Sequence, residues 1–283
     1  MQPVVLRGTI AHGEGKGHRA GFPTANLDIG SAAFPLYGVY ASLLKTEKGC
    51  LIPGVTNVGT RPTADDNPQP TVETWMPDFE GDLYGQRAVV ILLEYLRAIR
   101  PFESMEALKR QIDSDAARAA ALAGGICENS VVSHSADETK AFGKMLAGFL
   151  RRGDVLTLTG PLGAGKSELA RGIARGLGIE GVLPSPTFTI LNMYSQGRIP
   201  LYHYDWYRIE DPEELTAIGV EEHLPGDGIT LVEWAEQAPE LLPEDILDLR
   251  LIPLDESARL ITLTPRGGFR PVREWISEMK KKC

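Results

Sequence analysis

The sequence predicts two domains, an all-β domain followed by an α/β domain. In roughly the first 98 residues, short β-prone runs are separated by turn residues, with no helical pattern between them. This arrangement is typical of an antiparallel barrel or sandwich. Further along, apolar runs alternate with helical patterns around a glycine-rich loop at residues 160–167, which is typical of an α/β sheet. A chain of 283 residues is long enough for two cores of ordinary size.

Five β-prone runs and one helix make up the first predicted domain. The runs cover residues 4–10, 37–44, 50–58, 71–75 and 88–96. Residues 104–123 combine apolar spacing of helical period with many alanines, which predicts an amphipathic helix. Gly124 and Gly125 are expected to end that helix. We therefore expect the domains to span residues 1–125 and 126–283.

The second predicted domain opens with a capped helix and continues as alternating strands and helices. Ser135 and Glu138 form a capping box, and Gly153 is expected to end the helix that follows it. A short helix is expected in the C-terminal tail from residue 270 onward. The other predicted elements are strands at 155–158, 229–232, 246–251 and 260–263 and a helix at 167–177.

Composition excludes several classes of protein. A formal net charge of -9 disfavours a broad nucleic-acid-binding face, so any contact with RNA is expected to be indirect. No apolar run reaches the roughly 18 residues that a membrane span needs, and the apolar run near the N-terminus is too short for a secretory signal. Cys50, Cys127 and Cys283 are widely spaced and lack a C-x-x-C pairing. We expect a cytoplasmic protein with reduced thiols and no role at a membrane.

The loop GPLGAGKS predicts a nucleotide phosphate site. Gly160, Gly165, Lys166 and Ser167 fit the G-x-x-x-x-G-K-[ST] pattern after an apolar strand. Successive backbone N–H groups can surround a phosphate, and the following helix adds its positive end. Lys166 is expected to reach the β- and γ-phosphates of ATP, and the Ser167 hydroxyl to bind Mg²⁺. The residues assigned to the nucleotide here are Leu162, Gly163, Ala164, Gly165, Lys166 and Ser167.

A nucleotide site also needs a carboxylate at the end of a neighbouring strand, to hold the metal or orient water. Glu233 follows the apolar run 229–232 and is expected at the carboxyl end of that strand. Asp205, in LYHYDWYRIED, is the second candidate. Both are assigned catalytic roles, and Glu233 is also assigned to Mg²⁺.

Four segments behind the loop resemble the TsaE family, the ATPase of the bacterial tRNA threonylcarbamoyladenosine pathway. They are SPTFTI (185–190), HYDWYRI (203–209), ELTAIGVEEHL (214–224) and VEWAEQ (232–237). The resemblance covers about residues 130–265. It implies an ATPase that binds TsaB- and TsaD-type proteins and meets tRNA only through them. It further implies that Thr187 lies in a switch-like loop and that Trp234 packs near the nucleotide. Pro161 stands where the family usually has an acid.

Residues 13–27, GEGKGHRAGFPTANL, form the other dense motif. The glycine cluster alone is a weak signal, since a flexible hairpin has the same composition. The run Pro23 to Asn26 is expected to be a rigid turn that presents the Thr24 hydroxyl and the Asn26 amide as oxygen ligands for Mg²⁺. With Glu73 as a base, these groups suffice for phosphoryl transfer to a hydroxyl.

Residues 1–122 resemble riboflavin kinase. The resemblance rests on AHGEGKGHRAGFPTANL, LYGVYA (36–41), GVTNVGTRPT (54–63), VETW, DFEGDLYGQ (78–86) and FESMEALKRQIDSD (102–115). It implies a six-stranded Greek-key barrel with a C-terminal helix that converts riboflavin and ATP into FMN. On this basis Thr24 and Asn26 bind Mg²⁺-nucleotide, Glu73 is the base, and the phosphate loop includes Gly15, Lys16, Gly17 and Gly21. Trp75 and Ile99 replace the His and the acid that the family often has.

Two alternatives stay open. The first domain could bind flavin or nucleotide without catalysis, leaving the chain as an ATPase and assembly protein in tRNA modification. The second domain could be a kinase of a small metabolite, which keeps the same loop but moves phosphate to a small molecule. We expect the fusion of both activities, with ATP, Mg²⁺ and riboflavin as ligands.

Overall fold

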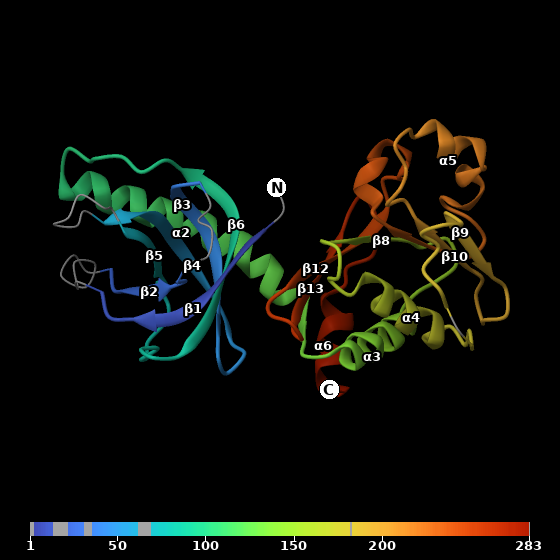
Figure 1. Cartoon of the computed structure of the whole chain (residues 1–283), viewed down its shortest axis with the longest axis horizontal. Helices are drawn as coiled ribbons and strands as arrows, with labels where there is room; N and C mark the ends of the chain where they lie inside the picture. Colours follow the sequence, from blue (N-terminus) through green and yellow to red (C-terminus); the bar gives the residue numbers. More distant parts are fainter. Residues whose placement is uncertain (1–2, 14–21, 31–35, 62–68, 182, 283) are drawn as a thin grey trace. The chain divides into compact units, whose positions relative to one another are not determined.

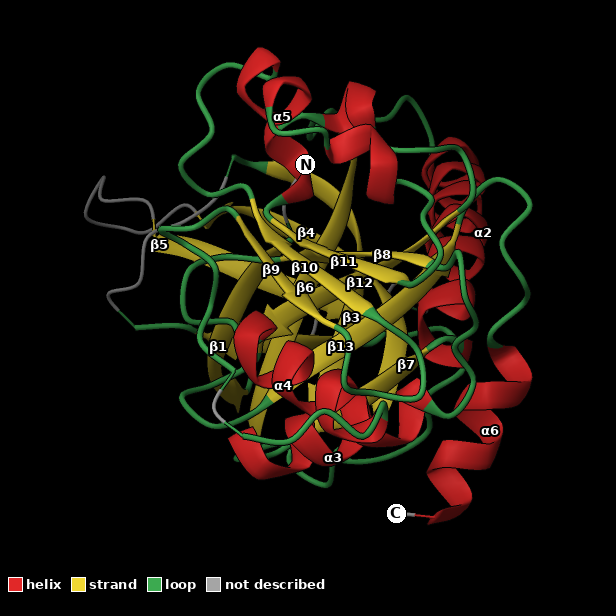
Figure 2. Ribbon diagram, turned by 90° about the vertical axis from the view of Figure 1, so that its right-hand side faces the viewer, coloured by secondary structure: helices red, strands yellow, loops and turns green. Residues whose placement is uncertain are grey.

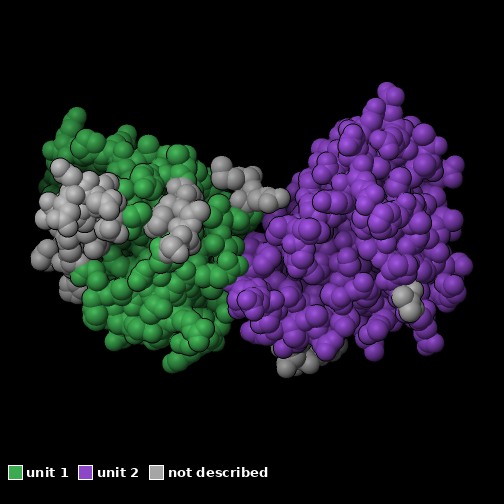
Figure 3. Space-filling model, in the orientation of Figure 1, with its two compact units in different colours: residues 1–127 green, residues 128–283 purple. Residues whose placement is uncertain are grey.

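The computed structural model describes residues 3–13, 22–30, 36–61, 69–181 and 183–282 (Figure 1). The chain divides into two compact units, Met1–Cys127 and Glu128–Cys283 (Figure 3). Over the residues described, none of the helices has the length and apolar character to cross a membrane.

The first unit is a closed antiparallel barrel of six strands. Its strands are β1 (Val4–Ala11), β2 (Thr24–Asp28), β3 (Gly38–Thr46), β4 (Leu51–Arg61), β5 (Gln69–Trp75) and β6 (Arg87–Arg97). They are ordered β1-β2-β5-β4-β3-β6 around the barrel. Because β3, β4 and β5 are consecutive neighbours and β6 returns beside β3, these four strands form a Greek key. The predicted barrel is therefore confirmed.

Residues alternate between the two sides of each barrel strand. Tyr40, Val58 and Val72 point into the core inside the barrel, together with Leu6, Leu27 and Leu92 from other strands. Their sequence neighbours point outward, because successive side chains of a strand leave on opposite faces. On β3 and β4 the outward residues Val39 and Val55 are also buried. A helix packs on this outer face and shields these residues from solvent.

Helix α2 (Met105–Glu128) covers the outer face of the barrel. Its Ala119 packs with Val39, Ala41 and Val55. The Ser104 hydroxyl accepts a hydrogen bond from the Ala107 N–H (3.1 Å), which begins the helix. The prediction that Gly124 and Gly125 end the helix is wrong. Neither glycine has a positive φ angle, and the helix runs through both to Glu128.

The second unit is built around a seven-stranded sheet in the order β7-β13-β12-β8-β11-β10-β9. Its strands are β7 (Ser130–Ser133), β8 (Val155–Thr159), β9 (Leu191–Tyr194), β10 (Leu201–Asp205), β11 (Ile229–Glu233), β12 (Ile246–Pro253) and β13 (Arg259–Pro265). The four central strands are parallel, and the others are antiparallel to their neighbours. This arrangement confirms the predicted α/β domain.

Helices cover both faces of the sheet. The longer ones are α3 (Ala136–Ala147), α4 (Lys166–Gly176) and α6 (Arg273–Lys282), which share one core with leucines of the central strands. On the other face lie α5 (Glu213–Ala217) and the 3₁₀ helices η1 (Val220–His223), η2 (Ala235–Gln237) and η3 (Pro239–Leu241). Figure 2 shows α3 and α4 on one side of these strands and α5 on the other.

A helix end and a turn differ from the structure predicted from the sequence. Helix α3 ends at Ala147 with Gly148 as its cap, so Gly153 lies beyond the helix in the turn that leads to β8. The expected turn at Pro23 to Asn26 is instead the start of strand β2, since Thr24, Ala25 and Asn26 pair with Trp75, Thr74 and Glu73 of β5. Pro23 stands just before this strand, where its missing N–H costs no pairing.

Candidate functional site

The glycine-rich loop joins β8 to α4 at the carboxyl edge of the parallel strands. Gly160 has φ 141°, and a Cβ there would lie 2.5 Å from the carbonyl oxygen of Leu251. Gly165 has φ 101° and is the cap residue from which α4 begins. Only glycine fits both positions without strain. The backbone N–H groups at this helix start are those that bind anions in such loops.

Lys166 is buried beneath the loop. Its Nζ donates hydrogen bonds to the carbonyl oxygens of Gly160 (2.7 Å) and Pro161 (3.0 Å) and lies 3.8 Å from the ring centroid of Trp234. Burial lowers the pKa of the ammonium group, against the opposing effect of nearby carboxylates, of which Glu233 is the largest. Trp234 has φ 58°, a left-handed conformation that is unusual for this residue type. In this conformation the Trp234 ring lies against the Lys166 ammonium group.

Glu233 is the last residue of β11 and lies beside the loop, as expected from the sequence. Its Oε2 accepts a hydrogen bond from the Ser167 hydroxyl (3.2 Å). Its Oε1 lies 3.0 Å from Nε2 of His203, a buried residue on the neighbouring strand β10. His203 was not among the residues predicted from the sequence. The signal was available, because His203 and Asp205 are two residues apart and so share one face of β10.

Asp205 organises the segment after residue 184. Its Oδ2 accepts hydrogen bonds from the hydroxyls of Thr187 (2.6 Å) and Ser185 (3.0 Å), and its Oδ1 from the backbone N–H of Tyr207 (3.0 Å). Strand register puts Asp205 directly beside Glu233. The two predicted carboxylates and Thr187 therefore come together with the loop.

The donor atoms at this site suit Mg²⁺ and a nucleotide. Ser167 and Glu233 offer a hydroxyl and a carboxylate oxygen, which are hard ligands, and Mg²⁺ usually takes only one or two protein groups besides water and phosphate. Leu162 and Gly163 are exposed at the tip of the loop, and a Cβ on Gly163 would meet nothing within 4 Å. The tip of the loop is therefore open to solvent. Across the residues described, no group of three or more His, Cys, Asp and Glu side chains could hold a metal by itself.

In the barrel, strand register brings the candidate residues together on the outer face. Asn26 of β2 pairs with Glu73 of β5, and Glu73 pairs with Asn57 of β4 on its other side. Thr24 lies two residues before Asn26 and therefore on the same face. Asn57 was not predicted from the sequence, because its position beside Glu73 depends on the pairing of β4 with β5. Gly15, Lys16, Gly17 and Gly21 lie outside the described residues.

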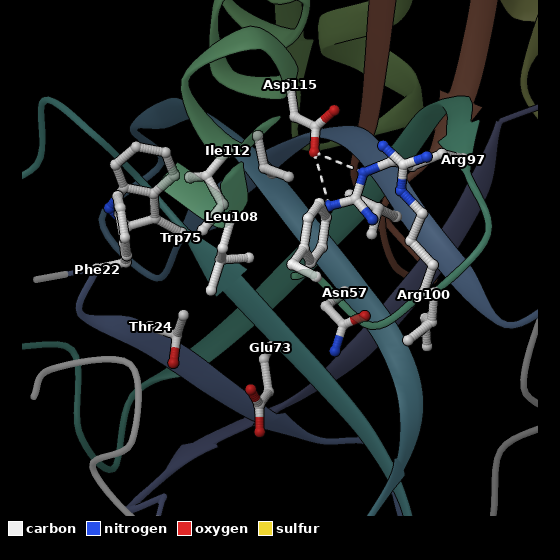
Figure 4. Close-up of a pocket in the computed structure, with 14 residues that line it drawn as sticks. Phe22, Thr24, Asn57, Glu73, Trp75, Arg97, Arg100, Leu108, Ile112 and Asp115 are labelled. Carbon is white, nitrogen blue, oxygen red and sulfur yellow. Dashed lines mark hydrogen bonds and ion pairs between the residues drawn. The ribbon is translucent and has the colours of Figure 1, made fainter. Parts of the chain in front are cut away.

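A cavity of about 480 Å³ lies between this outer face and α2 (Figure 4). Its walls are largely apolar: Phe22, Val39, Val55, Trp75, Leu108 and Ile112. In Figure 4 Thr24 and Glu73 lie at one end of the drawn residues, and Asp115 with Arg97 at the other. The rings of Phe22 and Trp75 make a T-shaped, edge-to-face contact, with their centroids 5.0 Å apart. Such a cavity suits a planar ring system with a polar arm directed at Glu73.

The far end of the cavity is fixed by an ion pair. Nε of Arg97 donates to Oδ2 of the buried Asp115 (2.9 Å), and Gln111 donates to Oδ1 of the same carboxylate (2.9 Å). Arg97 and Arg100 both lie over the ring of Phe102. These contacts tie the end of β6 and the segment after it to α2, so the cavity has a rigid polar end.

Comparison with known proteins assigns the two units. The family model "Threonylcarbamoyl adenosine biosynthesis protein TsaE" matches residues 133–261. A tRNA threonylcarbamoyladenosine biosynthesis protein TsaE of Bacillus subtilis is 47% identical over 132 residues, 47% of this chain and 82% of that protein. The chain belongs to the TsaE family. A second TsaE protein, of Treponema pallidum, is 40% identical over 132 residues, 47% of this chain and 97% of that protein.

The TsaE region of the chain also matches a solved structure, and the first unit matches a second family. A crystal structure of Bacillus subtilis YdiB has 37% sequence identity and a TM-score of 0.45, covering 54% of this chain and 94% of that chain. The family model "Riboflavin kinase" matches residues 1–123. This TsaE family member therefore carries a riboflavin kinase domain in front of its TsaE domain.

Proposed function

We propose that this chain has two activities. Residues 1–125 transfer a phosphoryl group from ATP to the terminal ribityl hydroxyl of riboflavin, giving FMN. Residues 126–283 hydrolyse ATP in support of threonylcarbamoyladenosine modification of tRNA. Each proposal is supported by a family match and by a separate constellation of residues, and neither requires the other, since a shared need for ATP is not a shared mechanism.

The register row Asn26, Glu73 and Asn57, of which Glu73 and Asn57 line the cavity, carries the proposal for the first domain. A cavity of about 480 Å³ is within the usual size range of small-molecule sites. The apolar walls would hold the isoalloxazine ring. The Glu73 carboxylate would accept the proton of the ribityl hydroxyl as its oxygen bonds to the γ-phosphorus and the bond to the β-phosphate oxygen breaks.

Thr24 lines the cavity, and Asn26 pairs with Glu73 in the strand register. Their side-chain oxygens would hold Mg²⁺ with the nucleotide phosphates. Bound there, the ion would neutralise part of the phosphate charge. The glycine-rich residues Gly15, Lys16, Gly17 and Gly21 remain the proposed phosphate loop of this domain.

The convergence of Lys166, Ser167 and Glu233 on one loop carries the proposal for the second domain. Lys166 would exchange its two loop carbonyls for phosphate oxygens, and Ser167 and Glu233 would hold Mg²⁺. Asp205, with Thr187 and Ser185 bound to it, would orient the attacking water. Partner proteins of the TsaB and TsaD type would couple this hydrolysis to tRNA, which the chain meets only through them, in the cytoplasm.

FMN formation from riboflavin and MgATP by the full chain tests the first activity. We expect Glu73→Gln to lower the rate by about a hundredfold or more, because general base catalysis typically contributes at least that factor. Lys166→Ala should leave FMN formation unchanged. Glu80→Gln, an exposed substitution on the segment after β5, is the matched control. Flavin that binds without turnover in the wild type would instead support the flavin-binding alternative.

Release of inorganic phosphate from ATP tests the second activity. Lys166→Ala and Glu233→Gln should each abolish it, whereas Glu73→Gln and the exposed Glu240→Gln should not. The assay should be run with and without TsaB- and TsaD-type proteins. Phosphate that appears on a small metabolite, with none released to water, would contradict the proposal and favour a metabolite kinase.

A further inference from the structure

A buried arginine lies against the glycine-rich loop and belongs to none of the motifs. Arg259 is the first residue of β13 and is 9% exposed. A Cβ added to Gly165 would lie 3.5 Å from both Cδ and Nε of Arg259. The side chain therefore runs alongside the cap residue of α4, one residue before Lys166.

The guanidinium of Arg259 makes one hydrogen bond within the described part of the chain. NH1 donates to the buried Thr139 hydroxyl (3.0 Å), and among the described residues no carboxylate pairs with the group. The remaining N–H donors find no partner in the described part of the chain, yet they are not sealed from solvent. A largely buried arginine that keeps free donors beside an anion-binding loop is placed to bind an anionic ligand.

Sheet order determines which part of a nucleotide would meet Arg259. Strand β8, which leads into the loop, has β11 with Glu233 on one side and β12 followed by β13 on the other. Because β13 is antiparallel to β12, its first residue lies at the same edge of the sheet as the loop. Arg259 and Glu233 thus flank the loop on opposite sides. With the terminal phosphate near Lys166 and Glu233, the phosphate chain would extend toward Arg259.

We propose that Arg259 binds the α-phosphate of the nucleotide, and that Thr139 holds its guanidinium for this contact. This inference rests on the proposed binding of ATP at the Lys166 loop. Thr139 is well placed for the positioning role, since its hydroxyl also contacts Ser133 (2.8 Å) and the carbonyl oxygen of Ser135 (3.0 Å). A planar guanidinium with several free donors matches phosphate better than an ammonium group does.

Calorimetric titration of the full chain with MgADP and with inorganic phosphate tests the proposal. Inorganic phosphate is a single group, so bound at the Lys166 loop it has no second phosphate to reach Arg259. The Lys166→Ala chain serves as the reference, so that heat from the riboflavin kinase domain is subtracted. We expect Arg259→Gln to raise the Kd for ADP by about tenfold or more and the Kd for inorganic phosphate by less than about twofold.

Two further variants sharpen the comparison. Arg259→Lys keeps the charge and the reach to Thr139, so it should fold as the wild type does and weaken ADP binding by an intermediate factor. Arg175→Gln, an exposed arginine of α4, removes the same charge and should change neither Kd.

The results separate this proposal from the one on which it rests. An unchanged Kd for ADP in Arg259→Gln and Arg259→Lys would overturn the role of Arg259. Equal losses for ADP and inorganic phosphate would also overturn it, because they would indicate a purely structural effect on the loop. A wild-type chain without Lys166-dependent ADP binding would contradict the proposed ATP site itself.

Discussion

Nε2 of His203 lies 3.0 Å from Oε1 of Glu233, and both side chains are almost completely buried, at 4% and 3% exposed. The other carboxylate oxygen faces the Ser167 hydroxyl. Each oxygen of Glu233 therefore has its own partner, and the imidazole fixes the rotation of the carboxylate. Groups that orient a metal ligand in this way usually change metal affinity by about 10–100-fold when removed.

We expect His203→Ala to raise the Mg²⁺ concentration needed for half-maximal ATP hydrolysis by about tenfold or more. His203→Gln keeps a donor near Oε1 and should recover part of the loss. Replacement of the exposed His134 by alanine is the control. Identical Mg²⁺ dependence in the wild type and His203→Ala would show that Glu233 does not need the imidazole.

Lys166 gives the stability of the ligand-free protein a defined pH dependence. Burial lowers its folded-state pKa below the ordinary 10.5. Between these two pKa values the unfolded chain holds a proton that the folded chain has released, so the destabilising effect of the buried charge fades as pH rises. Lys166→Met should therefore be more stable than the wild type at neutral pH, by a difference that shrinks toward pH 10.5. Urea denaturation followed by tryptophan fluorescence measures this difference, and a constant gap across the alkaline range would contradict it.

A directed row of hydroxyl groups crosses the inside of the barrel. The Ser42 hydroxyl donates its single proton to the carbonyl oxygen of Gly54 (3.0 Å). Thr56 must therefore be the donor in its 2.7 Å hydrogen bond with Ser42. By the same reasoning, Thr74 must be the donor in its 2.8 Å hydrogen bond with Thr56. Thr56→Val breaks two of these bonds and leaves buried polar atoms unpaired. We expect it to cost about 1–3 kcal/mol of unfolding free energy.

Thr74→Val is the matched control for this row, because it removes only the last donor and leaves Thr56 bonded to Ser42. Its cost should be smaller than that of Thr56→Val. Hydrogen exchange of the β4 amides reports on the barrel alone and measures both variants. Equal costs would show that the row is not directed as inferred.

Asp115 should support both the stability of α2 and the shape of the cavity. Asp115→Asn removes the negative charge that pairs with Arg97. It also replaces one of the two carboxylate oxygens, which accept hydrogen bonds from Arg97 and Gln111, by an NH₂ group that cannot accept one. We expect a loss of about 1–3 kcal/mol, less than for a fully buried pair because Arg97 is partly exposed. Riboflavin affinity, measured by quenching of flavin fluorescence, should fall as well. The exposed Asp113→Asn on the same helix should change neither quantity.

Much of the second site could be predicted because its signals are local. The loop, the strand before it and the helix after it are contiguous, and Glu233 directly follows an apolar run that reads as a strand. His203 shares a strand face with Asp205, but its contact with Glu233, like the position of Arg259 beside the loop, could not be found in the same way. Their roles depend on which strands are neighbours in the sheet, and a strand's neighbours are set by packing of the whole domain.

In the barrel, local reasoning failed where tertiary pairing overrides propensity. Pro23 suggested a turn, yet the three residues after it pair with β5 and take strand geometry. Gly124 and Gly125 suggested a helix end, but a glycine ends a helix mainly by adopting a positive φ, and neither does so. A Cβ at either position would meet nothing within 4 Å, so close packing does not require glycine there.

Strand β5 carries two separate sets of residues. Val72 and Thr74 belong to the closed interior, while Glu73 and Trp75 face the cavity. Because Glu73 and Trp75 do not belong to the interior set, a substitution at either position changes the lining of the cavity and leaves the interior of the barrel untouched. Ligand preference and folding are therefore separable properties along this part of the strand.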